Sequence, residues 1–376
     1  MKVQTRRLVS TDKVPVCMHS RPQTSPHRQK GVALISAMLV VTLVATLASV
    51  ALWQQWRHVE VESAERQRIQ SSWLLSGAFD WTRLILREDA LAGVAGASLT
   101  SGDGKVSATG GIDHLGEPWA LPLKEAKLST FLAQDQQLRE GDPEVFLSGQ
   151  VTDAQSRINL SQWVEPKDAK GQTRLSPTMQ LRLSRLFGLL GLPGTELEAL
   201  SQAWLAATQA ARNRNVAAST DRMSEASALL PLQTGQLQWL GIRAETVAAL
   251  MPYVTILPES TPVNLNTASA EVIYASVGGL DLSSAQKFVQ ARGQSHFDNL
   301  TDAAKALGVK SLDTAQFSVS SKYFEAWGRL RLEDRIQEET ALIFRDGGNT
   351  RLVWRQKIAG ILPPANQESL LQSKKL

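Results

Sequence analysis

The pattern of apolar and polar residues begins with one long apolar run. Residues 32–52 hold no charged side chain and consist mainly of Ala, Val, Leu and small hydroxyl residues. A helix of this length is about 30 Å long, which matches the hydrocarbon thickness of a membrane, so a membrane-spanning helix is predicted over 32–53. Over 54–90, apolar side chains recur at steps of three and four, which predicts that the helix continues outside the membrane with one apolar face.

Strand signals and helix signals follow in separate blocks. Residues 144–151 and 157–160 are predicted to form a hairpin, and turn residues at 346–349 predict a second one. Between them, Ser176 followed by proline is typical of a helix start, and Ser283 opens a capping box. We therefore predict an α+β fold, in which a long N-terminal helix packs on an antiparallel sheet and a large all-α insertion interrupts the sheet.

These blocks divide the chain into successive segments. The glycine-rich stretch after residue 91 is expected to be a loop, because it shows no helical period. The expected divisions are 1–31 (basic leader), 32–53 (membrane helix), 54–90 (amphipathic helix), 91–173 (first part of the β region), 174–319 (all-α insertion), 320–362 (C-terminal strands) and 363–376 (polar tail).

Charge is concentrated at the N-terminus. The chain has a formal net charge of +4, but residues 1–30 hold seven basic side chains against one acid, so the remainder is close to neutral. The positive-inside rule therefore predicts a cytoplasmic N-terminus, with the bulk of the chain on the other side of the membrane. A cleaved secretory signal is the alternative, although its apolar region would be shorter.

The sequence contains few residues that point to catalysis. Its one cysteine, Cys17, lies in the basic leader, so the rest of the chain offers neither a disulfide nor a thiolate. Outside the leader, the histidines are His58, His114 and His296, and none has zinc-ligand spacing. The Asp113-His114 pair is interpreted as part of a solvated loop. A membrane-anchored enzyme remains a third hypothesis, without a catalytic motif to support it.

The junction before the apolar run carries a family resemblance. Lys30-Gly31 placed directly before Val32 resembles the cleavage site of type IV prepilins and type II secretion pseudopilins. The resemblance implies that a prepilin peptidase cuts after Gly31 and methylates the new N-terminus at Val32. Most such proteins have glutamate at the fifth mature position, whereas this chain has Ser36. Both the missing glutamate and the length resemble the minor pseudopilin K family of type II secretion, also called general secretion pathway protein K.

That resemblance implies a function in protein export. It implies a non-enzymatic subunit at the tip of the pseudopilus, anchored in the inner membrane, with a pilin-like sheet in the periplasm. The implied partners are the other minor pseudopilins of a tip heterotrimer, the pseudopilus, the prepilin peptidase and inner-membrane lipid, with secreted proteins as further candidates. Relatives bind calcium in the helical insertion. Because Asp221 and Glu225 alone do not make a site, no metal ligand and no cofactor is assigned.

One face of the apolar run is a candidate assembly surface. Thr42, Ala45, Thr46 and Ser49 recur at helical steps, so small and weakly polar side chains share a face on which a neighbouring helix can approach closely. The alternative is that these are small residues tolerated in lipid.

The segment 261–269 resembles the opening of a helix-hairpin-helix or SAM-like unit, with Asn264, Asn266 and Thr267 as its polar residues. The same opening occurs in competence DNA receptors, so a membrane-anchored DNA receptor is the alternative function. Such units bind phosphate through backbone amides of a glycine hairpin. Here the hairpin segment 277–282 lacks the spaced glycine pair and contains an acid, and the chain outside the leader has no net positive charge. We therefore favour a protein-binding scaffold and expect no nucleic acid partner.

Overall fold

The computed structural model describes residues 30–100, 111–128, 144–165, 173–216, 229–332 and 335–358. The backbone alone is described at 30–31, 93–100 and 213–216. The chain divides into two compact units, residues 1–66 and 67–376, and each is described by itself. The predicted leader before residue 30 and the predicted tail at 363–376 lie outside the described residues.

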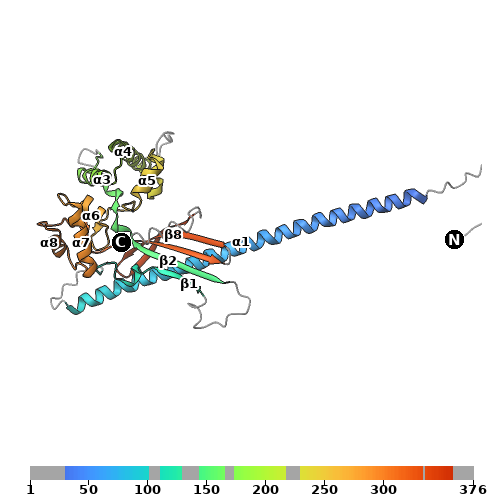
Figure 1. The fold of residues 1–376 in the computed structure, drawn as a ribbon, viewed down its shortest axis with the longest axis horizontal. Coiled ribbons are helices and arrows are strands. Elements are labelled where there is room, and N and C mark those ends of the chain that lie inside the picture. The colour runs from blue at the N-terminus through green and yellow to red at the C-terminus, as the bar shows by residue number, and fades with distance from the viewer. Residues whose placement is uncertain are drawn as a thin grey trace, which may run out of the picture. The chain divides into compact units, whose positions relative to one another are not determined.

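The first unit contains the apolar half of helix α1, which spans Lys30–Thr100 (Figure 1). Every side chain from 32 to 63 is exposed, because none of the other described residues packs against this part of the helix. Among the described residues, this is the one helix long and apolar enough to cross a membrane. An apolar helix with no protein around it is the arrangement expected when lipid is its solvent.

Helix α1 is longer than the sequence predicts. The helix was expected to end at residue 90 and to be followed by a loop, but it continues to Thr100 and includes Gly93 and Gly96. Each glycine costs about 1 kcal/mol relative to alanine. The alanines at 90, 92, 95 and 97 offset that cost, because alanine has the highest helix propensity.

The second unit is built on a five-stranded antiparallel sheet in the order β1-β2-β7-β8-β9 (Figure 1). The predicted turn at 346–349 is confirmed, since Asp346 pairs with Asn349 where β8 meets β9. The strands are β1 (Leu123–Lys127), β2 (Val145–Asp153), β7 (Tyr323–Leu332), β8 (Arg335–Asp346) and β9 (Asn349–Ile358).

The second half of α1 covers one face of this sheet. Leu75, Phe79 and Leu86 are buried against apolar side chains of β7 and β8, among them Phe324 and Ile343. Burying each such side chain contributes roughly 1.5–3 kcal/mol. A helix packed on an antiparallel sheet, with helices inserted between its strands, confirms the predicted α+β fold.

The predicted hairpin of 144–151 with 157–160 is wrong. Strand β2 pairs with β1 and β7, whereas β3 (Ile158–Asn159) pairs in parallel with β4 (Val254–Thr255). The short helix η2 (Ala154–Ser156) turns the chain away from the sheet. Both residues of β3 are buried, so β3 belongs to the core of the inserted region and not to a half-exposed hairpin.

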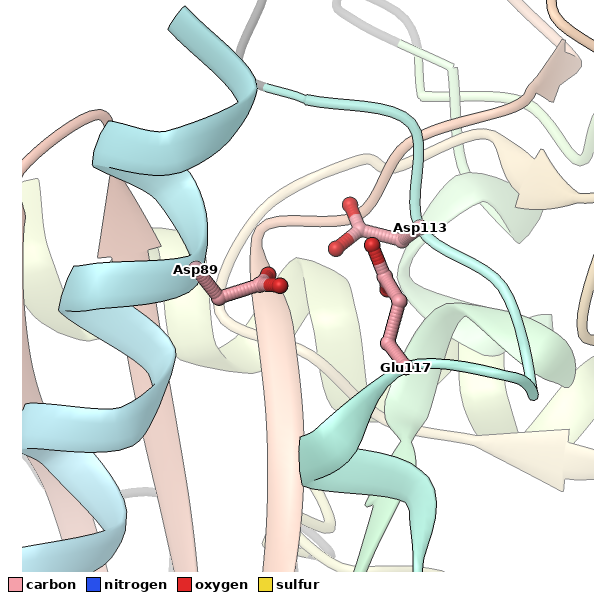
Figure 2. A group of neighbouring side chains, drawn as sticks. All are labelled: Asp89, Asp113 and Glu117. Carbon is pink, nitrogen blue, oxygen red and sulfur yellow. The ribbon is translucent and has the colours of Figure 1, made fainter. Parts of the chain in front are cut away.

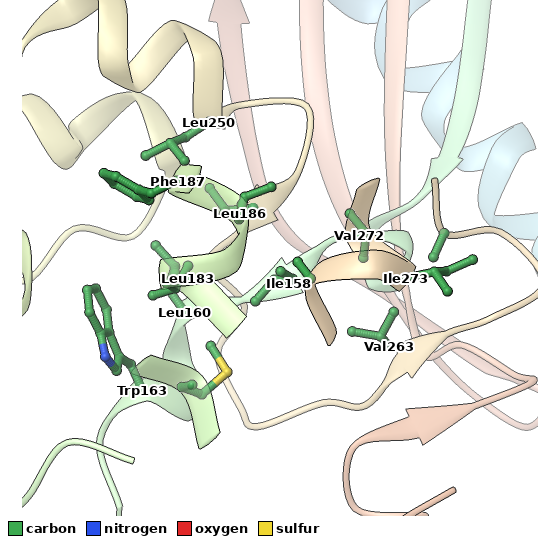
Figure 3. Close-up of a cluster of buried hydrophobic side chains, with 14 of the residues drawn as sticks. Ile158, Leu160, Trp163, Leu183, Leu186, Phe187, Leu250, Val263, Val272 and Ile273 are labelled. Atoms are coloured by element: carbon green, nitrogen blue, oxygen red, sulfur yellow. The ribbon is translucent and has the colours of Figure 1, made fainter. Parts of the chain in front are cut away.

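Along the chain, the insertion follows β2 and precedes β7, and these two strands are neighbours in the sheet. Its helices gather beyond one end of the sheet (Figure 1). Its own apolar core includes Trp163, Leu183, Phe187, Leu250 and Ile273 (Figure 3). The helices are α3 (Pro177–Leu189), α4 (Gly194–Val216), η4 (Thr234–Leu240), α5 (Ala244–Leu250), α6 (Ala270–Ser276), α7 (Leu282–Gln294) and α8 (Leu300–Leu307).

The insertion is not purely helical, in contrast to the expected all-α region. The pair β3 and β4 is joined by a second parallel pair, β5 (Val263–Asn264) with β6 (Phe317–Ser318). Each of these strands has two residues, which is too short to give a period-2 pattern in the sequence. Strand β5 contains Asn264, the first of the three motif residues Asn264, Asn266 and Thr267.

Candidate functional site: the apolar helix and the polar junction

Helix α1 places the residues of the predicted cleavage site and assembly face. Gly31 lies in its first turn, and Val32 and Ser36 follow with exposed side chains from Val32 onward. The Ser36 hydroxyl donates a hydrogen bond to the Ala33 carbonyl, so this polar group is satisfied within its own helix. That arrangement removes most of the cost of a hydroxyl in lipid.

The small residues of the candidate assembly face are also satisfied internally. Thr42 and Thr46 donate to the carbonyls of Leu39 and Leu43, and Ser49 donates to the carbonyl of Ala45. All of these side chains are exposed. Their hydroxyls do not require a partner helix, so their use as an assembly face stays a prediction.

The polar residues of the 261–269 segment lie in a buried cluster at the end of the sheet. We call this cluster the polar junction, and it consists of Asp113, Asp153, Asn264, Thr267, Ser321 and Arg345, all nearly inaccessible to solvent. It brings together the 111–117 loop, the ends of β2 and β8, the start of β5 and the residues before β7. The junction therefore attaches the insertion to the sheet.

Asp153 is the main acceptor of the polar junction. Its Oδ2 accepts hydrogen bonds from Asn264 Nδ2 at 2.9 Å and from the hydroxyls of Thr267 and Ser321, each at 2.6 Å. Its Oδ1 accepts the backbone N–H of Gln155. Burial raises the pKa of Asp153, while these hydrogen bonds act in the opposite direction. A buried carboxyl group with this many donors fixes the geometry around it.

The structure brings the side chains of Asn264 and Thr267 together at Asp153, whereas only the backbone N–H of Asn266 binds Asn264 and its side chain lies elsewhere. Asn264 Nδ2 also donates to the Asp113 carbonyl and to Ser321 Oγ. Asn266 instead exchanges two hydrogen bonds of 3.0 Å with the backbone of Phe297, and so fixes the loop between α7 and α8. All three polar residues of the motif are therefore engaged in bonds within the chain.

The interpretation of Asp113 as a solvated loop residue is wrong. Asp113 is buried, and its Oδ2 accepts the backbone N–H of Ser321 at 2.7 Å. The guanidinium of Arg345 contacts Asp113 Oδ1 and also binds Asp89 of α1 at 2.7 Å. Arg345 thus links α1, the 111–117 loop and β8 through one side chain.

Asp89, Asp113 and Glu117 form the one group of acidic side chains, among the described residues, whose ligand atoms lie within 4.8 Å of one another. The three carboxyl groups project from α1 and from the 111–117 loop into a shared space (Figure 2). Burial raises the pKa values of Asp113 and Glu117 to about 7, although Arg345 lowers both.

Arg345 determines what this acidic group can bind. A calcium ion prefers several charged oxygens, but here one guanidinium already contacts two of the three carboxyl groups. The raised pKa values reduce the negative charge further at neutral pH. The group is therefore a partly buried ion-pair network, and it lies outside the insertion, the region in which the family resemblance makes a calcium site possible. Asp221 and Glu225 lie outside the described residues.

The hairpin between α6 and α7 differs from a phosphate-binding one. Asp281 begins α7 as its N-cap, and its Oδ1 accepts the N–H of Ser284 at 2.6 Å, so the capping box predicted at Ser283 is displaced. A carboxylate therefore occupies the helix end where a phosphate would bind. The Arg185 guanidinium donates to the carbonyls of Val277 and Leu280 in this hairpin. This cation is therefore engaged in hydrogen bonds within the chain.

Sequence reasoning missed the partners of the motif. Asp153, Ser321 and Arg345 lie far from the 261–269 segment in the chain, and nothing in the local sequence marks Ser321 or Arg345. A signal did exist for Asp153, because an acid directly after a half-buried strand and before a chain turn is a candidate side-chain cap. Arg345 lies at the end of β8 and had no comparable signal.

The chain is similar in sequence to type II secretion system proteins. Residues 263–320 match the family model described as Type II secretion system (T2SS), protein K. Type II secretion system protein K of Pseudomonas aeruginosa is 27% identical over 348 residues, which cover 89% of this chain and 95% of the relative. The protein of the same name from Klebsiella pneumoniae is 23% identical over 346 residues, which cover 88% of this chain and 97% of the relative.

One solved structure has the same fold. A chain in the crystal structure of the GspK-GspI-GspJ complex from the enterotoxigenic Escherichia coli Type 2 Secretion System superposes with a TM-score of 0.54 at 17% identity. The match covers 79% of this chain and 99% of that chain. Together, the family model, the two relatives and the fold confirm the resemblance to type II secretion system protein K that the membrane junction and residues 261–269 predict.

Proposed function

We propose that this chain is a non-enzymatic minor pseudopilin that occupies the tip of the type II secretion pseudopilus. The observation that carries the proposal is Ser36 in an exposed apolar helix. In a pilin-type filament, the usual glutamate at this position pairs with the N-terminal amine of the subunit ahead. A tip subunit has no subunit ahead, so an unpaired carboxylate there would only add a cost of a few kcal/mol.

The proposed partners are other minor pseudopilins. Support comes from the matching fold, whose solved example is a complex of three pseudopilins, GspK, GspI and GspJ. The size of the insertion also favours the tip. A helical region of this bulk, inserted between β2 and β7, would hinder close stacking of many copies along one filament.

The proposed location is the inner membrane, with a single pass through it. The basic residues before α1 favour a cytoplasmic N-terminus, and the acids at 60, 62 and 65 follow the apolar run on the opposite side. The insertion and the sheet are then periplasmic. The residues of the polar junction serve the fold in this proposal, and no catalytic cofactor is required.

Processing at Gly31 tests the proposal. We expect Gly31→Leu to leave uncleaved precursor in the membrane and to abolish secretion, because the peptidase must approach the backbone closely at this position. In the unchanged protein, mass spectrometry of membrane extracts should find N-methylated Val32 as the terminus. Gly77→Leu is the matched control, since a side chain there meets no atom within 4 Å. Normal cleavage of Gly31→Leu would contradict the proposal.

A further inference from the structure

A cavity lies between the 111–117 loop and the C-terminal end of α7. It has a volume of about 460 Å³, and its lining includes His114, Gly116, Asn266, Arg292, Gly293 and His296. None of the lining residues is acidic. The cavity is therefore bordered by one guanidinium and two imidazoles without a carboxylate in its wall.

The charge of Arg292 is poorly compensated within the fold. Its Nη1 donates a hydrogen bond of 2.6 Å to the Leu265 carbonyl, a neutral acceptor. Burial alone lowers the pKa of Arg292 to about 10, and no carboxylate among the described residues opposes this shift. Arg292 is half-buried, and a cation that is partly removed from water is normally paired with an anion, because desolvation of an unpaired charge is costly.

The two histidines add further donors. Their rings are stacked with centroids 3.9 Å apart and an angle of 7° between the planes. His114 Nδ1 accepts the backbone N–H of Gly116, and His296 Nε2 lies 3.4 Å from Asp298 Oδ1, outside the lining of the cavity. His114 Nδ1 accepts, so Nε2 of the neutral ring carries the proton and can donate to a bound acceptor. His296 Nε2 faces Asp298, so its Nδ1 can donate only when the ring is protonated.

We propose that this cavity binds an oxyanion, either a carboxylate or a phosphate group. The guanidinium of Arg292 presents a planar set of donors that matches both groups, and the imidazoles supply additional donors. The bound anion compensates the half-buried charge of Arg292. This proposal does not depend on the tip function, because the cavity is formed within this chain wherever the subunit lies in a pseudopilus.

Gly293 provides a variant that closes the cavity without disturbing the fold. It lies in α7 and lines the cavity, and a Cβ atom added at this position meets no atom within 4 Å. Gly293→Leu should therefore fill the cavity while raising helix propensity. Arg292→Gln removes the charge and keeps a donor for the Leu265 carbonyl. Gly188→Leu is the matched control, because Gly188 also lies in a helix and faces open space away from the cavity.

The test is thermal unfolding of the full chain in detergent, with citrate and inorganic phosphate as separate probes at constant ionic strength. We expect a saturable rise in Tm at probe concentrations up to about 20 mM, below the range of general salt effects. Gly188→Leu should retain this rise, Gly293→Leu should lose it, and Arg292→Gln should need at least about tenfold more probe.

The two probes separate the two sources of the anion. A response to citrate alone assigns a carboxylate site, and a response to phosphate alone assigns a phosphate site. No saturable rise with either probe overturns the proposal. A rise retained at full strength in Gly293→Leu or in Arg292→Gln also overturns it, because the effect would then arise elsewhere on the chain.

Discussion

Single residues of the polar junction support the attachment of the insertion. Replacing Asp153 by alanine removes the acceptor of three buried side-chain donors at once. We expect Asp153→Ala to lower the free energy of unfolding by about 3 kcal/mol, because the donors of Asn264, Thr267 and Ser321 lose a charged partner in a buried site. Asp153→Asn keeps the shape but replaces one acceptor with a donor, so it should also destabilise the chain.

The measurement for Asp153 is urea unfolding followed by circular dichroism in detergent. Asp80→Ala is the control, since Asp80 is an exposed acid paired with Arg83 and should change the free energy of unfolding by less than about 1 kcal/mol. Equal midpoints for the two alanine variants would mean that the Asp153 hydrogen bonds contribute little.

Glu117 gives the junction a pH dependence. Burial raises its pKa from 4.5 to about 7, so the folded state holds this proton more tightly than the unfolded chain. The free energy of unfolding should therefore fall as the pH rises from about 4.5 to about 7. Glu117→Gln keeps an acceptor for Trp119 Nε1 and His114 N–H but removes the charge.

The pH profile of Glu117→Gln should be flatter than that of the unchanged protein. We expect equal unfolding free energies at pH 4 and a variant more stable by on the order of 1 kcal/mol at pH 8, after allowance for solvent screening of a partly exposed group. Thermal unfolding at both pH values measures the difference. A variant that is less stable at pH 8 would show that the ionised carboxylate is favourable in the fold.

At the scale of elements, helix α1 differs between its two parts. Its second half is held by the sheet through Leu75, Phe79 and Leu86, whereas the side chains of the apolar half contact no other segment that the structure describes. Thr46→Leu combined with Ser49→Leu should reduce crosslinking to other pseudopilins and leave membrane insertion intact, because close helix approach needs small side chains. Site-specific crosslinking in membranes measures this.

Val40→Leu with Val41→Leu is a control that adds bulk within the same apolar run, outside the face of small residues. If the Thr46 and Ser49 changes crosslink as strongly as this control, the small residues are merely tolerated in lipid.

Local patterns predicted some elements of the fold and not others. The apolar run, the amphipathic half of α1 and the hairpin of β8 with β9 were predictable, because each is encoded by a periodic pattern or by turn residues. The pairing of β2 with β7 was not, since its partners lie far apart in the chain. The hairpin expected after β2 failed for the same reason: β3 is paired by distant residues of β4.

The candidate site shows the same limit. Asn264 and Thr267 were identified from a motif, but their partners Asp153 and Ser321 depend on how the sheet and the insertion meet. The cleavage predicted at Gly31 needed no tertiary structure, because the resemblance rests on a short local sequence, and it stays a prediction.

At the scale of the whole molecule, tip placement predicts an effect of copy number. Overproducing the chain should give shorter or fewer pseudopili, because more of them begin or end with a subunit that cannot be extended. Electron microscopy with immunogold labelling should place the chain at filament ends. Label along the whole length of long filaments would contradict tip placement and leave only a general pseudopilin function.

The position of β7 in the sheet sets an order of folding. β7 lies at the centre of the sheet but follows the whole insertion in the chain, and β8 and β9 follow β7. As the chain is synthesised, the apolar face of α1 therefore emerges long before the strands that bury it. Contacts between residues so distant in sequence form slowly. The nascent chain thus carries an uncovered apolar helix face for most of its synthesis, a period in which it depends on chaperones and is open to proteolysis.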